Sequence, residues 1–381
     1  MISLAPLAAV ILASLVSKTN AAAYGFATGV TGGGSATAAA PSDIAQLKTW
    51  LADSTARVIL INKTFNFKGS EGTATSSGCY QSSCPVSSGG QDYIGTISCS
   101  GSNMLSTTIT YDVAGATPLV VASSKTILGV GSAGIIQGKG LRLPATTTNV
   151  IIQNIHITDI NPSHVWGGDA LQLEGNKGVW IDHNKFSLIG RQFIVSHYAA
   201  SQFTVSNNEF YGVTTTSAVC NGDHYWTNMF IGPGDLITID RNYYHDVSGR
   251  APKLGESGVR TTVHATNNLF YNMAGHAFDI YSGTYALIEG NAFITVTTPM
   301  ASQTGAIYNV PDSTSASTCS SYLGRNCQLN AFGSNVGTWP SLTNTAVLDV
   351  FKVYDTKYIV TPISGGSVTA SVVANAGIGK I

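Results

Sequence analysis

The sequence predicts an all-β protein that folds as a right-handed, single-stranded parallel β-helix. The first observation is a motif that recurs five times: an apolar residue, two variable residues, an asparagine, one variable residue and an aromatic. Its asparagines are Asn184, Asn208, Asn242, Asn268 and Asn291, spaced 24, 34, 26 and 23 residues apart. The second observation is that the segments around them are short, rich in Val, Ile, Thr, Tyr and Gly, and lack the 3.6-residue periodicity of helices. A repeat of this length, built from short β segments, is typical of a solenoid.

Each repeat supplies the residues that a stacked coil needs. The apolar residue and the aromatic can be buried inside the coil, and the asparagine amides can hydrogen-bond from one coil to the next at a corner. The core of a solenoid is linear, so a single domain can reach the 381 residues of this chain. The alternative is an ordinary β-sandwich whose turns contain asparagines by chance.

The first residues have the pattern of a secretory signal peptide. An apolar run over 4–16 is followed by the small-residue stretch SKTNAAA, which predicts cleavage near Ala21 to Ala23. We assign 1–21 to the signal peptide and 22–381 to a single β-helix domain. No other segment is long and apolar enough to cross a bilayer, so we expect the mature protein to be soluble and extracellular.

A short helix is expected over 42–51, before the first coils. Ser42 can cap it, and the helix would cover the open end of the solenoid, where unpaired strand edges would otherwise be exposed. The runs predicted as early coils are 58–60, 118–122 and 126–137.

Two insertions and a tail complete the predicted organisation. The first insertion lies near 69–117 and contains a stretch of low regularity between Cys79 and Cys99. The second is a long Thr/Ser-rich loop over 295–345. The tail after residue 346 is expected to pack along the outside of the solenoid.

The stretch 235–253 joins a predicted strand to a loop that carries two cations. Apolar alternation from Leu236 predicts the strand, and the irregular run after it carries Arg250 and Lys253. Loops fixed to a rigid scaffold are common places for function. Both cations are therefore candidate functional residues, and the alternative for Arg250 is a simple salt bridge on the loop.

Six cysteines, an even number in a chain that carries an export signal, predict three disulfides. They are Cys79, Cys84, Cys99, Cys220, Cys319 and Cys327. Cys319 and Cys327 are close enough in sequence to close a local loop, and the other pairings stay open. A metal site is the alternative, but there is no C-x-x-C spacing and the eight histidines are scattered. A glycosylation sequon begins at Asn62.

The charge balance argues against two classes of partner. With 19 Lys and Arg against 20 Asp and Glu, the formal net charge is −1. Such a chain has no electrostatic attraction for nucleic acid or for an acidic membrane. We expect neither partner, and we expect a monomer.

Four short motifs stand on this repeat in a defined order. They are Trp166-Gly-Gly-Asp169, Trp180-Ile-Asp182-His183, Gly190-Arg191 and Ser248-Gly-Arg250-Ala-Pro-Lys253. Taken together with the six cysteines, they resemble the secreted fungal-type pectin lyases of polysaccharide lyase family 1. The resemblance extends from the first cysteines to the loop of Cys319 and Cys327, and so covers most of the mature chain.

The resemblance implies a pectate lyase-like β-helix with an external groove. It implies endo-acting cleavage of the α-1,4 bonds of methyl-esterified homogalacturonan by β-elimination, which leaves 4,5-unsaturated oligogalacturonates. Pectin is then the expected partner. The matching site residues are catalytic Arg250, with Asp169, Arg191 and Lys253 around it. The implied disulfides are Cys79–Cys99, Cys84–Cys220 and Cys319–Cys327.

Aromatic residues near these motifs are candidates for stacking on sugar rings. Trp166, Tyr225 and Trp226 are expected to face the groove, and the alternative is that they belong to the core. The stretch from Cys79 to Cys99 departs from the family, because it carries tyrosines and no tryptophan where well-known members have several. Asp182 and His183 lie within a predicted coil and are expected to be structural.

No metal cofactor is expected. Related pectate lyases bind Ca²⁺ through carboxylates, and two of those positions fall here on Arg191 and Val195, neither of which can ligate Ca²⁺. Only Asp169 remains of that cluster, so a cation built into the protein takes the place of the metal, which favours an esterified substrate.

Three other functions are alternatives to that of a pectin lyase. A Ca²⁺-dependent pectate lyase is the nearest alternative. A polygalacturonase would need paired aspartates as acid and base, and no adjacent pair occurs in the chain. A non-catalytic β-helix that binds cell-wall polysaccharide would be indicated by loss of Arg250 or Lys253, and both are present.

Overall fold

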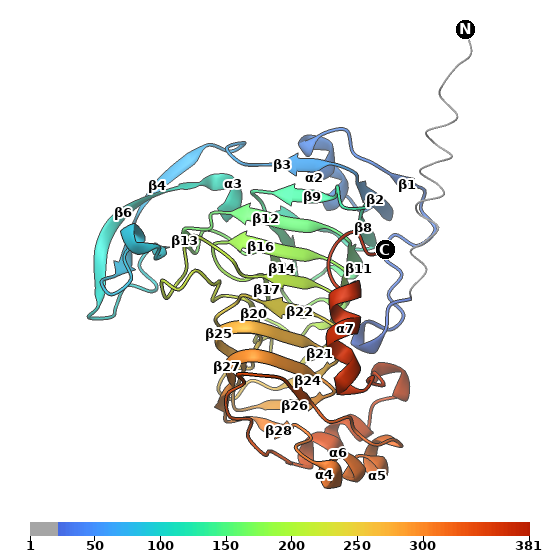
Figure 1. Cartoon of the computed structure of the whole chain (residues 1–381). Helices are drawn as coiled ribbons and strands as arrows, with labels where there is room; N and C mark the ends of the chain where they lie inside the picture. The colour runs from blue at the N-terminus through green and yellow to red at the C-terminus, as the bar shows by residue number, and fades with distance from the viewer. Residues whose placement is uncertain (1–21) are drawn as a thin grey trace.

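A computed structural model describes residues 22–381, and the predicted signal peptide, 1–21, lies outside the described residues. The chain winds into a parallel β-helix with three faces, which we call A, B and C (Figure 1). Each coil runs along face A, turns at an asparagine, runs along face B, and returns through a loop to face C. All strand pairs within these faces are parallel.

The strands of the three faces are as follows. Face A contains β1 (Ala38–Ala39), β2 (Arg57–Ile61), β8 (Lys125–Gly129), β11 (Thr148–Gln153), β15 (Lys177–Asp182), β18 (Gln202–Ser206), β21 (Asp235–Asp240), β24 (Thr261–Thr266), β26 (Thr284–Glu289) and β28 (Ala306–Tyr308). Face B contains β3 (Thr64–Asn66), β9 (Ile135–Gln137), β12 (His156–Ile160), β16 (Lys185–Ile189), β19 (Glu209–Tyr211), β22 (Tyr243–His245), β25 (Leu269–Ile280), β27 (Ala292–Gln303) and β29 (Ala331–Phe332). Face C contains β7 (Leu119–Val120), β10 (Leu141–Leu143), β14 (Leu171–Leu173), β17 (Ile194–Ser196), β20 (Asn228–Phe230) and β23 (Lys253–Leu254), and the end of β25 continues from face B into face C, where it pairs with β23.

The recurring asparagines form a continuous ladder at the corner between faces A and B. From Asn184 to Asn291, each side-chain Nδ2 donates to the Oδ1 of the next asparagine at 2.9–3.0 Å. Each Nδ2 also donates to a backbone carbonyl of the preceding coil. All five amides are buried, so these bonds satisfy polar groups that would otherwise be costly to desolvate. The expected ladder is confirmed.

The aromatic of each motif stacks inside the coil, next to the ladder. Phe186, Phe210, Tyr244, Phe270 and Phe293 lie one above another, with ring centroids 4.6–5.3 Å apart and planes within 10–19° of parallel. All five are fully buried in the main core. The centroid spacing matches the separation of neighbouring strands, so one ring fits each coil.

A sixth copy of the motif lies where a long loop was expected. Cys327, Asn330 and Phe332 occupy its apolar, asparagine and aromatic positions, and the amide of Asn330 accepts from Asn291 at 3.0 Å. The expectation of a loop throughout 295–345 is therefore wrong. The region also contains part of β27, as well as β28, α4 (Ser313–Thr318) and α5 (Ser320–Leu323). Its threonines are β-branched and suit a strand, and a cysteine at the apolar position concealed the repeat.

The first insertion is an arm of antiparallel strands rather than an irregular segment. It contains β4 (Thr73–Gln81), η2 (Val86–Ser88), β5 (Asp92–Ile94), β6 (Met104–Asp112) and α3 (Val113–Ala116). β4 pairs with β6 along its whole length, and β5 pairs with β13 (His164–Val165), which belongs to the loop between β12 and β14. Extended Ser and Thr stretches pair with each other here, which the lack of apolar alternation had hidden. Figure 1 shows the arm projecting from the solenoid.

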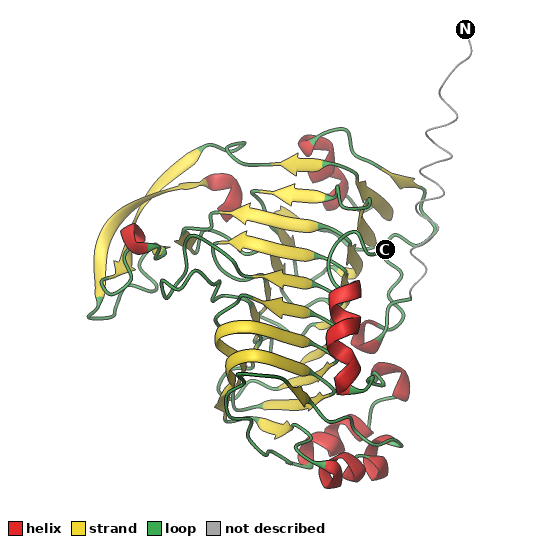
Figure 2. Cartoon of the chain, viewed as in Figure 1, coloured by secondary structure: helices red, strands yellow, loops and turns green. Residues whose placement is uncertain are grey.

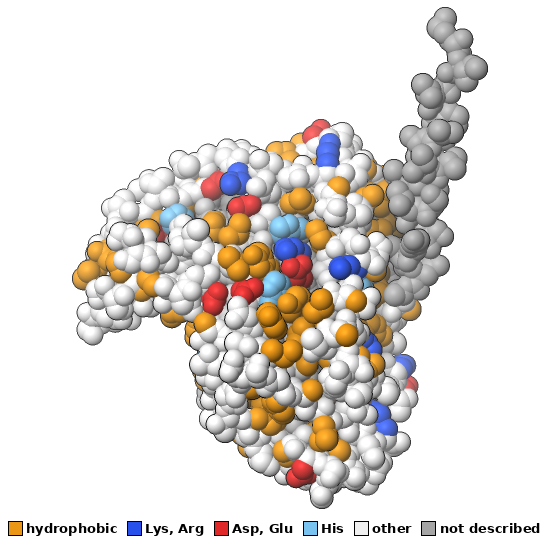
Figure 3. Space-filling view, viewed as in Figure 1, with side chains coloured by type: hydrophobic (Ala, Val, Ile, Leu, Met, Phe, Trp, Pro, Cys, Tyr) orange, Lys and Arg blue, Asp and Glu red, His pale blue; other side chains and the backbone are white. Residues whose placement is uncertain are grey.

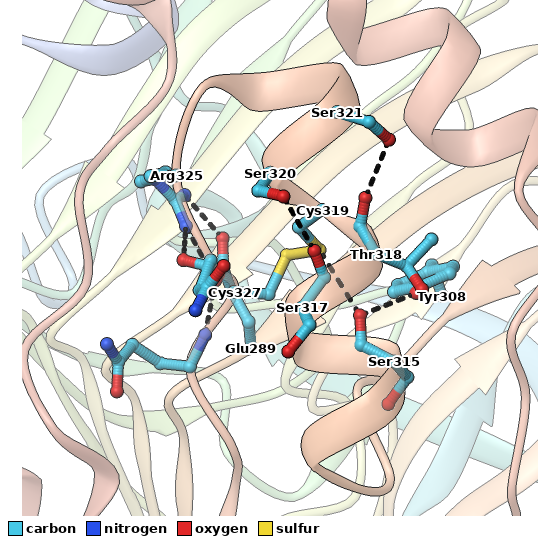
Figure 4. Close-up of a disulfide and its surroundings, with 12 residues drawn as sticks. Glu289, Tyr308, Ser315, Ser317, Thr318, Cys319, Ser320, Ser321, Arg325 and Cys327 are labelled. Atoms are coloured by element: carbon cyan, nitrogen blue, oxygen red, sulfur yellow. Dashed lines mark hydrogen bonds and ion pairs between the residues drawn. A yellow bond between two sulfur atoms is a disulfide. The ribbon is translucent and has the colours of Figure 1, made fainter.

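Three disulfides are present, and they are the pairs that the family resemblance implies. Cys79–Cys99 lies within the arm, and Cys84–Cys220 ties the arm to the loop between β19 and β20. Cys319–Cys327 closes the short loop around α5, beside the ion pair of Arg325 and Glu289 (Figure 4).

Helices lie at the two ends of the solenoid and along its outside (Figure 2). The expected N-terminal helix is α2 (Ile44–Ala52), which places Leu47 and Leu51 in the main core. Its cap is Asp43 and not Ser42: the Asp43 carboxylate accepts from the N–H of Gln46, and Ser42 donates to Asp43. An aspartate directly before the first turn outcompetes the hydroxyl one residue earlier.

The C-terminal tail packs along the outside, as expected. It contains α6 (Ala346–Lys352), η3 (Thr356–Tyr358) and α7 (Gly365–Asn375), and α7 places Val368 and Val372 against face B. The N-terminal segment 22–30, with η1 (Gly25–Ala27), lies across face A. Within residues 22–381, no helix is long and apolar enough to cross a membrane.

The ladder predicts a large stability loss when one rung is removed. Asn242→Ala leaves the N–H of Asn208 and the carbonyl of Val205 without side-chain partners in a buried corner. We expect the free energy of unfolding to fall by about 2–4 kcal/mol, measured by denaturant titration. The matched control is Asn375→Ala, at the exposed end of α7, which should change it by less than about 0.5 kcal/mol. Equal stability of both variants would refute a structural role for the ladder.

Candidate active-site groove

The outward side chains of face C form the floor of a groove. Strand register places Gln172, Val195, Met229, Lys253 and Asp279 in one row across β14, β17, β20, β23 and β25. Because side chains alternate along a strand, their neighbours point into the core. The loops that lead into these strands bring Asp169, Arg191, Trp226 and Arg250 to one edge of the floor.

The arm forms one wall of this groove. Figure 3 shows it overhanging a recess beside the body of the solenoid. Gln91 of the arm is almost fully buried and donates to the carbonyls of Pro162 and Gly190, while its Oε1 accepts from Trp226 Nε1 at 3.0 Å. The arm is thereby fixed to the same loops that carry the candidate residues.

Arg250 lies in the groove without a carboxylate partner. Within residues 22–381, none of the ion pairs closer than 4.0 Å involves its guanidinium. Instead the guanidinium carbon lies 4.6 Å from the ring centroid of Trp226 and 5.9 Å from that of Tyr225, and Nη1 lies 3.4 Å from Met229 Sδ. The alternative of a simple loop salt bridge is therefore wrong.

The backbone of Arg250 is held in an unusual conformation. Its φ is 47°, in the left-handed region that a side chain rarely adopts, and its N–H donates to His276 Nε2 at 3.1 Å. Gly249 precedes it because a Cβ there would lie 2.5 Å from the Tyr225 ring. Such strain at a groove residue indicates that its position matters for function.

Burial is the main cause of the lowered pKa of Arg250, and the positive charge of Arg191 acts in the same direction. The pKa of Lys253 is lowered for the same reasons, by burial first and by the charge of Arg250 second. Lys253 Nζ lies 4.8 Å from the ring centroid of Tyr281 and 3.9 Å from Glu256 Oε1. Three cations therefore share a partly desolvated site.

Asp169 and Arg191 form the one ion pair among the four catalytic candidates. Asp169 is 5% exposed, and its carboxylate accepts from the N–H of Gln192 at 2.8 Å, from Gln172 Nε2 at 3.0 Å and from Arg191 Nη1 at 3.4 Å. The Arg191 guanidinium also stacks on Trp166, 3.9 Å from its ring centroid. Asp169 thus holds the cation in place.

The three candidate aromatics are half-buried and do not present fully open faces. Arg191 covers one face of Trp166, and Arg250 lies over Trp226. Trp166 Nε1 donates to Ser98 of the arm at 3.0 Å, so its edge is also held. These rings support the guanidinium groups, which sequence reasoning did not anticipate.

The structure separates Asp182 and His183 from the groove. Asp182 is fully buried on face A, where it accepts from Gln153, Ser206 and His183 at 2.6–2.8 Å. This arrangement agrees with the structural role expected for both residues.

Sequence reasoning missed Gln91, Met229, Asp279 and Tyr281. Met229 and Asp279 could have been found by aligning successive coils, because Lys253 pairs with both, and Tyr281 lies two residues after Asp279. Gln91 lies in an insertion with no repeat, so no sequence pattern locates it.

The side chains of the site determine whether it could bind a metal ion. Val195 is fully buried between Gln172 and Met229, and Arg191 occupies the space beside Asp169. In the part of the chain that the structure describes, no group of three or more His, Cys, Asp or Glu side chains could hold a metal ion. The arrangement instead places guanidinium and ammonium groups where negative charge could develop.

Comparison with solved structures supports the fold. The chain resembles a pectate lyase from Paenibacillus sp. 0602, with a TM-score of 0.62 at 16% identity, over 94% of this chain and 96% of that one. It also resembles a pectate lyase from Bacillus sp. N165 solved with trigalacturonate, with a TM-score of 0.58 at 20% identity, over 94% and 99% of the two chains. At these identities the likeness shows the pectate lyase-like β-helix alone.

Comparison at the level of sequence is more specific. A probable pectin lyase F-1 of Aspergillus terreus is 48% identical over 374 residues, which is 96% of this chain and 95% of the relative. Pectin lyase B of Emericella nidulans is 46% identical over 365 residues, which is 94% and 93% of the two chains. The family model described as pectate lyase matches residues 1–381. Because the family model matches the whole chain, and these relatives align with it over nearly their full length, this protein belongs to the pectate lyase family.

Proposed function

We propose that this protein is an endo-acting pectin lyase. Its substrate is methyl-esterified homogalacturonan, and it cleaves the α-1,4 bonds by β-elimination to give 4,5-unsaturated oligogalacturonates. The observation that carries the proposal is Arg250, a half-buried guanidinium with a lowered pKa and no carboxylate partner among residues 22–381, beside Arg191 and Lys253 in the groove. The names of relatives 46–48% identical to this chain support the same activity.

The reaction needs a base at C5 of the sugar and a stabilising charge at its carbonyl. The base removes the C5 proton, the C–H electron pair forms the C4–C5 double bond, and the glycosidic C4–O bond breaks. The departing oxygen then takes up a proton. In this assignment Arg250 takes the C5 proton, and Lys253 and Arg191 stabilise the negative charge that develops on the carbonyl oxygen.

An arginine base is physically demanding, because a free guanidinium has a pKa above about 12. The environment of Arg250 counters this in two ways. Burial disfavours its charged form, and the charge of Arg191 does so as well. Trp226 and Tyr225 hold the guanidinium in place, and Tyr225 opposes the lowering of its pKa without reversing it.

The preference for an ester follows from the charges in the groove. A methyl ester withdraws electrons from C5 better than a carboxylate, which must first be neutralised. Asp169 already engages Arg191, and Val195 supplies no ligand at the neighbouring position. A Ca²⁺-dependent pectate lyase is the second candidate, favoured by the fold of the solved relatives, and the first experiment below separates the two.

Secretion and N-glycosylation are proposed from other observations, namely the disulfides and the exposed sequon. Three disulfides support passage through an oxidising secretory compartment, which agrees with removal of 1–21 and secretion of 22–381 as a monomeric catalytic domain. Asn62 and Thr64 of the sequon are both exposed, in contrast to the buried ladder asparagines. N-glycosylation at Asn62 is therefore part of the proposal.

The first experiment tests the reaction and its independence of metal. Purified protein with highly esterified pectin and excess chelator should generate the ultraviolet absorbance of unsaturated products at nearly the rate seen without chelator. Added Ca²⁺ should not create comparable activity on polygalacturonate. Strict Ca²⁺ dependence would assign a pectate lyase, and no product with either substrate would favour a non-catalytic binder.

The second experiment tests Arg250. Arg250→Ala and Arg250→Lys should each lower kcat on esterified pectin by at least about 10²-fold, the contribution of a general base, because lysine lacks the reach and planar fork of arginine. KM should change little. Circular dichroism checks folding, and Arg260→Ala, at an exposed arginine, is the matched control. A folded Arg250→Ala variant with most of its kcat would remove Arg250 from the mechanism.

The third experiment uses the pH dependence. The deprotonated form of Arg250 is the active base, so kcat/KM should rise with pH towards its pKa. Arg191→Gln removes a positive charge that lowers this pKa, so the pKa should rise and the ascending limb should move to higher pH. Arg260→Gln should leave the profile in place. A limb that stays fixed or moves to lower pH in Arg191→Gln would contradict the coupling.

A further inference from the structure

A second group of polar and aromatic residues lies on face C, at the edge opposite the loops that carry Arg250. The backbone hydrogen bonds between the coils of this face continue one residue beyond the strands. There the N–H groups of His197, Ile231, Gly255 and Tyr281 each donate to a carbonyl of the preceding coil. These four residues form an outward row next to the row of Lys253, two positions further along each strand. The exposed residue Tyr198 directly follows the first of them.

Tyr198 is the least buried aromatic of this edge. Its side chain is 75% exposed, and its backbone φ is 69°, in the left-handed region that disfavours bulky residues. The ring lies flat on the imidazole of His197, with centroids 3.8 Å apart and planes 26° from parallel. One ring face is thereby supported from below, and the exposed fraction leaves the rest of the ring open to solvent.

The support beneath Tyr198 is an electrically balanced cluster. Arg142 makes two hydrogen bonds to Glu174, at 2.9 and 2.7 Å, and His197 Nε2 lies 4.0 Å from the same carboxylate. Nε2 is buried and has no hydrogen-bond partner among residues 22–381. Burial lowers the pKa of His197, which disfavours the charged form of the imidazole. No net charge therefore lies under the exposed ring.

The row places this cluster along the path of a polymer in the groove. Neighbouring parallel strands are about 4.8 Å apart, so His197 and Tyr281 are separated by about 14 Å along the solenoid axis. Tyr281 contacts Lys253. Ile231 and Gly255 lie between His197 and Tyr281 in this row, and Gly255 has no side chain to obstruct the groove. A chain that reacts at Arg250 and continues along the axis reaches Tyr198 a few sugar units away.

We propose that Tyr198, supported by His197 and the Arg142–Glu174 pair, forms a distal subsite for a methyl-esterified galacturonate unit of the same pectin chain. The ring stacks on the C–H face of the sugar. The neutral cluster suits an ester, because a free carboxylate would find no unpaired cation there. This inference rests on the proposed function, since it names a further binding position for that substrate.

A packing role does not account for Tyr198. Its ring contributes little to the core at 75% exposure, and a backbone strain retained at an exposed aromatic needs another cause. The adjacent Ala199 and Ala200 are exposed and small, so Tyr198 is the one side chain of this turn that can reach over a ligand.

Kinetics with substrates of different length test the subsite. Tyr198→Ala should raise KM for long esterified pectin about two- to tenfold, the range for loss of an aromatic contact, with kcat unchanged. KM for the shortest esterified oligomers that are cleaved should not change, because they do not reach the subsite. Tyr198→Phe should retain the wild-type KM. The matched control is Tyr271→Ala, a 41% exposed tyrosine in the face B part of β25, which should change nothing.

A binding measurement keeps the test independent of turnover. Affinity electrophoresis in gels containing highly esterified pectin would compare Arg250→Ala with Arg250→Ala/Tyr198→Ala, and the double variant should be retarded less. Equal retardation, or an equal rise in KM for short and long substrates, would overturn the subsite. If the wild-type protein produced no unsaturated product, the proposed function would fail, while the gel comparison would still decide whether Tyr198 binds pectin. Thermal midpoints should be the same for all variants of Tyr198.

Discussion

The asparagine ladder is the constraint on which the rest of the structure depends. Its amides hydrogen-bond to each other and to the backbone in a buried corner, so each coil is locked in register with the next. Side chains alternate along a strand, and a slip of one residue would turn the outward row of face C into the core. Lys253 would then be buried and Leu254 exposed. The ladder and the ring stack beside it therefore position groove residues that lie on a different face.

The groove holds several cations close together, and only some of them are neutralised by a carboxylate. Arg191 is compensated by Asp169, but Arg250 is held by Trp226, Tyr225 and the Met229 sulfur. Aromatic faces attract a guanidinium through their quadrupoles, yet they add no full negative charge. Burial then lowers the pKa of Arg250, and the same low polarity strengthens its interaction with charge that develops in a substrate.

The arm determines the shape of the groove and how far one side of it is exposed to solvent. Cys84–Cys220 attaches it to the loop before β20, and Gln91 attaches it to the loops that present Arg191 and Trp226. One insertion thus encloses one side of the groove and contacts two of the rings that support the cations, Trp166 and Trp226. On the opposite edge the turns are short, and the exposed ring of Tyr198 is the main feature there.

The sequence by itself determined the solenoid, the ladder, the burial of one aromatic in each coil and the position of the cationic loop. These features follow from local periodicity, because each coil repeats the same contacts with its neighbours. The motifs also identified Arg250, Lys253, Arg191 and Asp169 as a group.

Tertiary structure alone decided which residues support that group and how its charges are balanced. Gln91 reaches Trp226 across 135 positions of the sequence, and no repeat or spacing predicts such a contact. The sixth coil was hidden by Cys327 at an apolar position, and the arm by its polar strands, because their partners lie outside any local window. Burial lowers the pKa of Arg250, and burial is a property of the packed fold that sequence patterns do not carry.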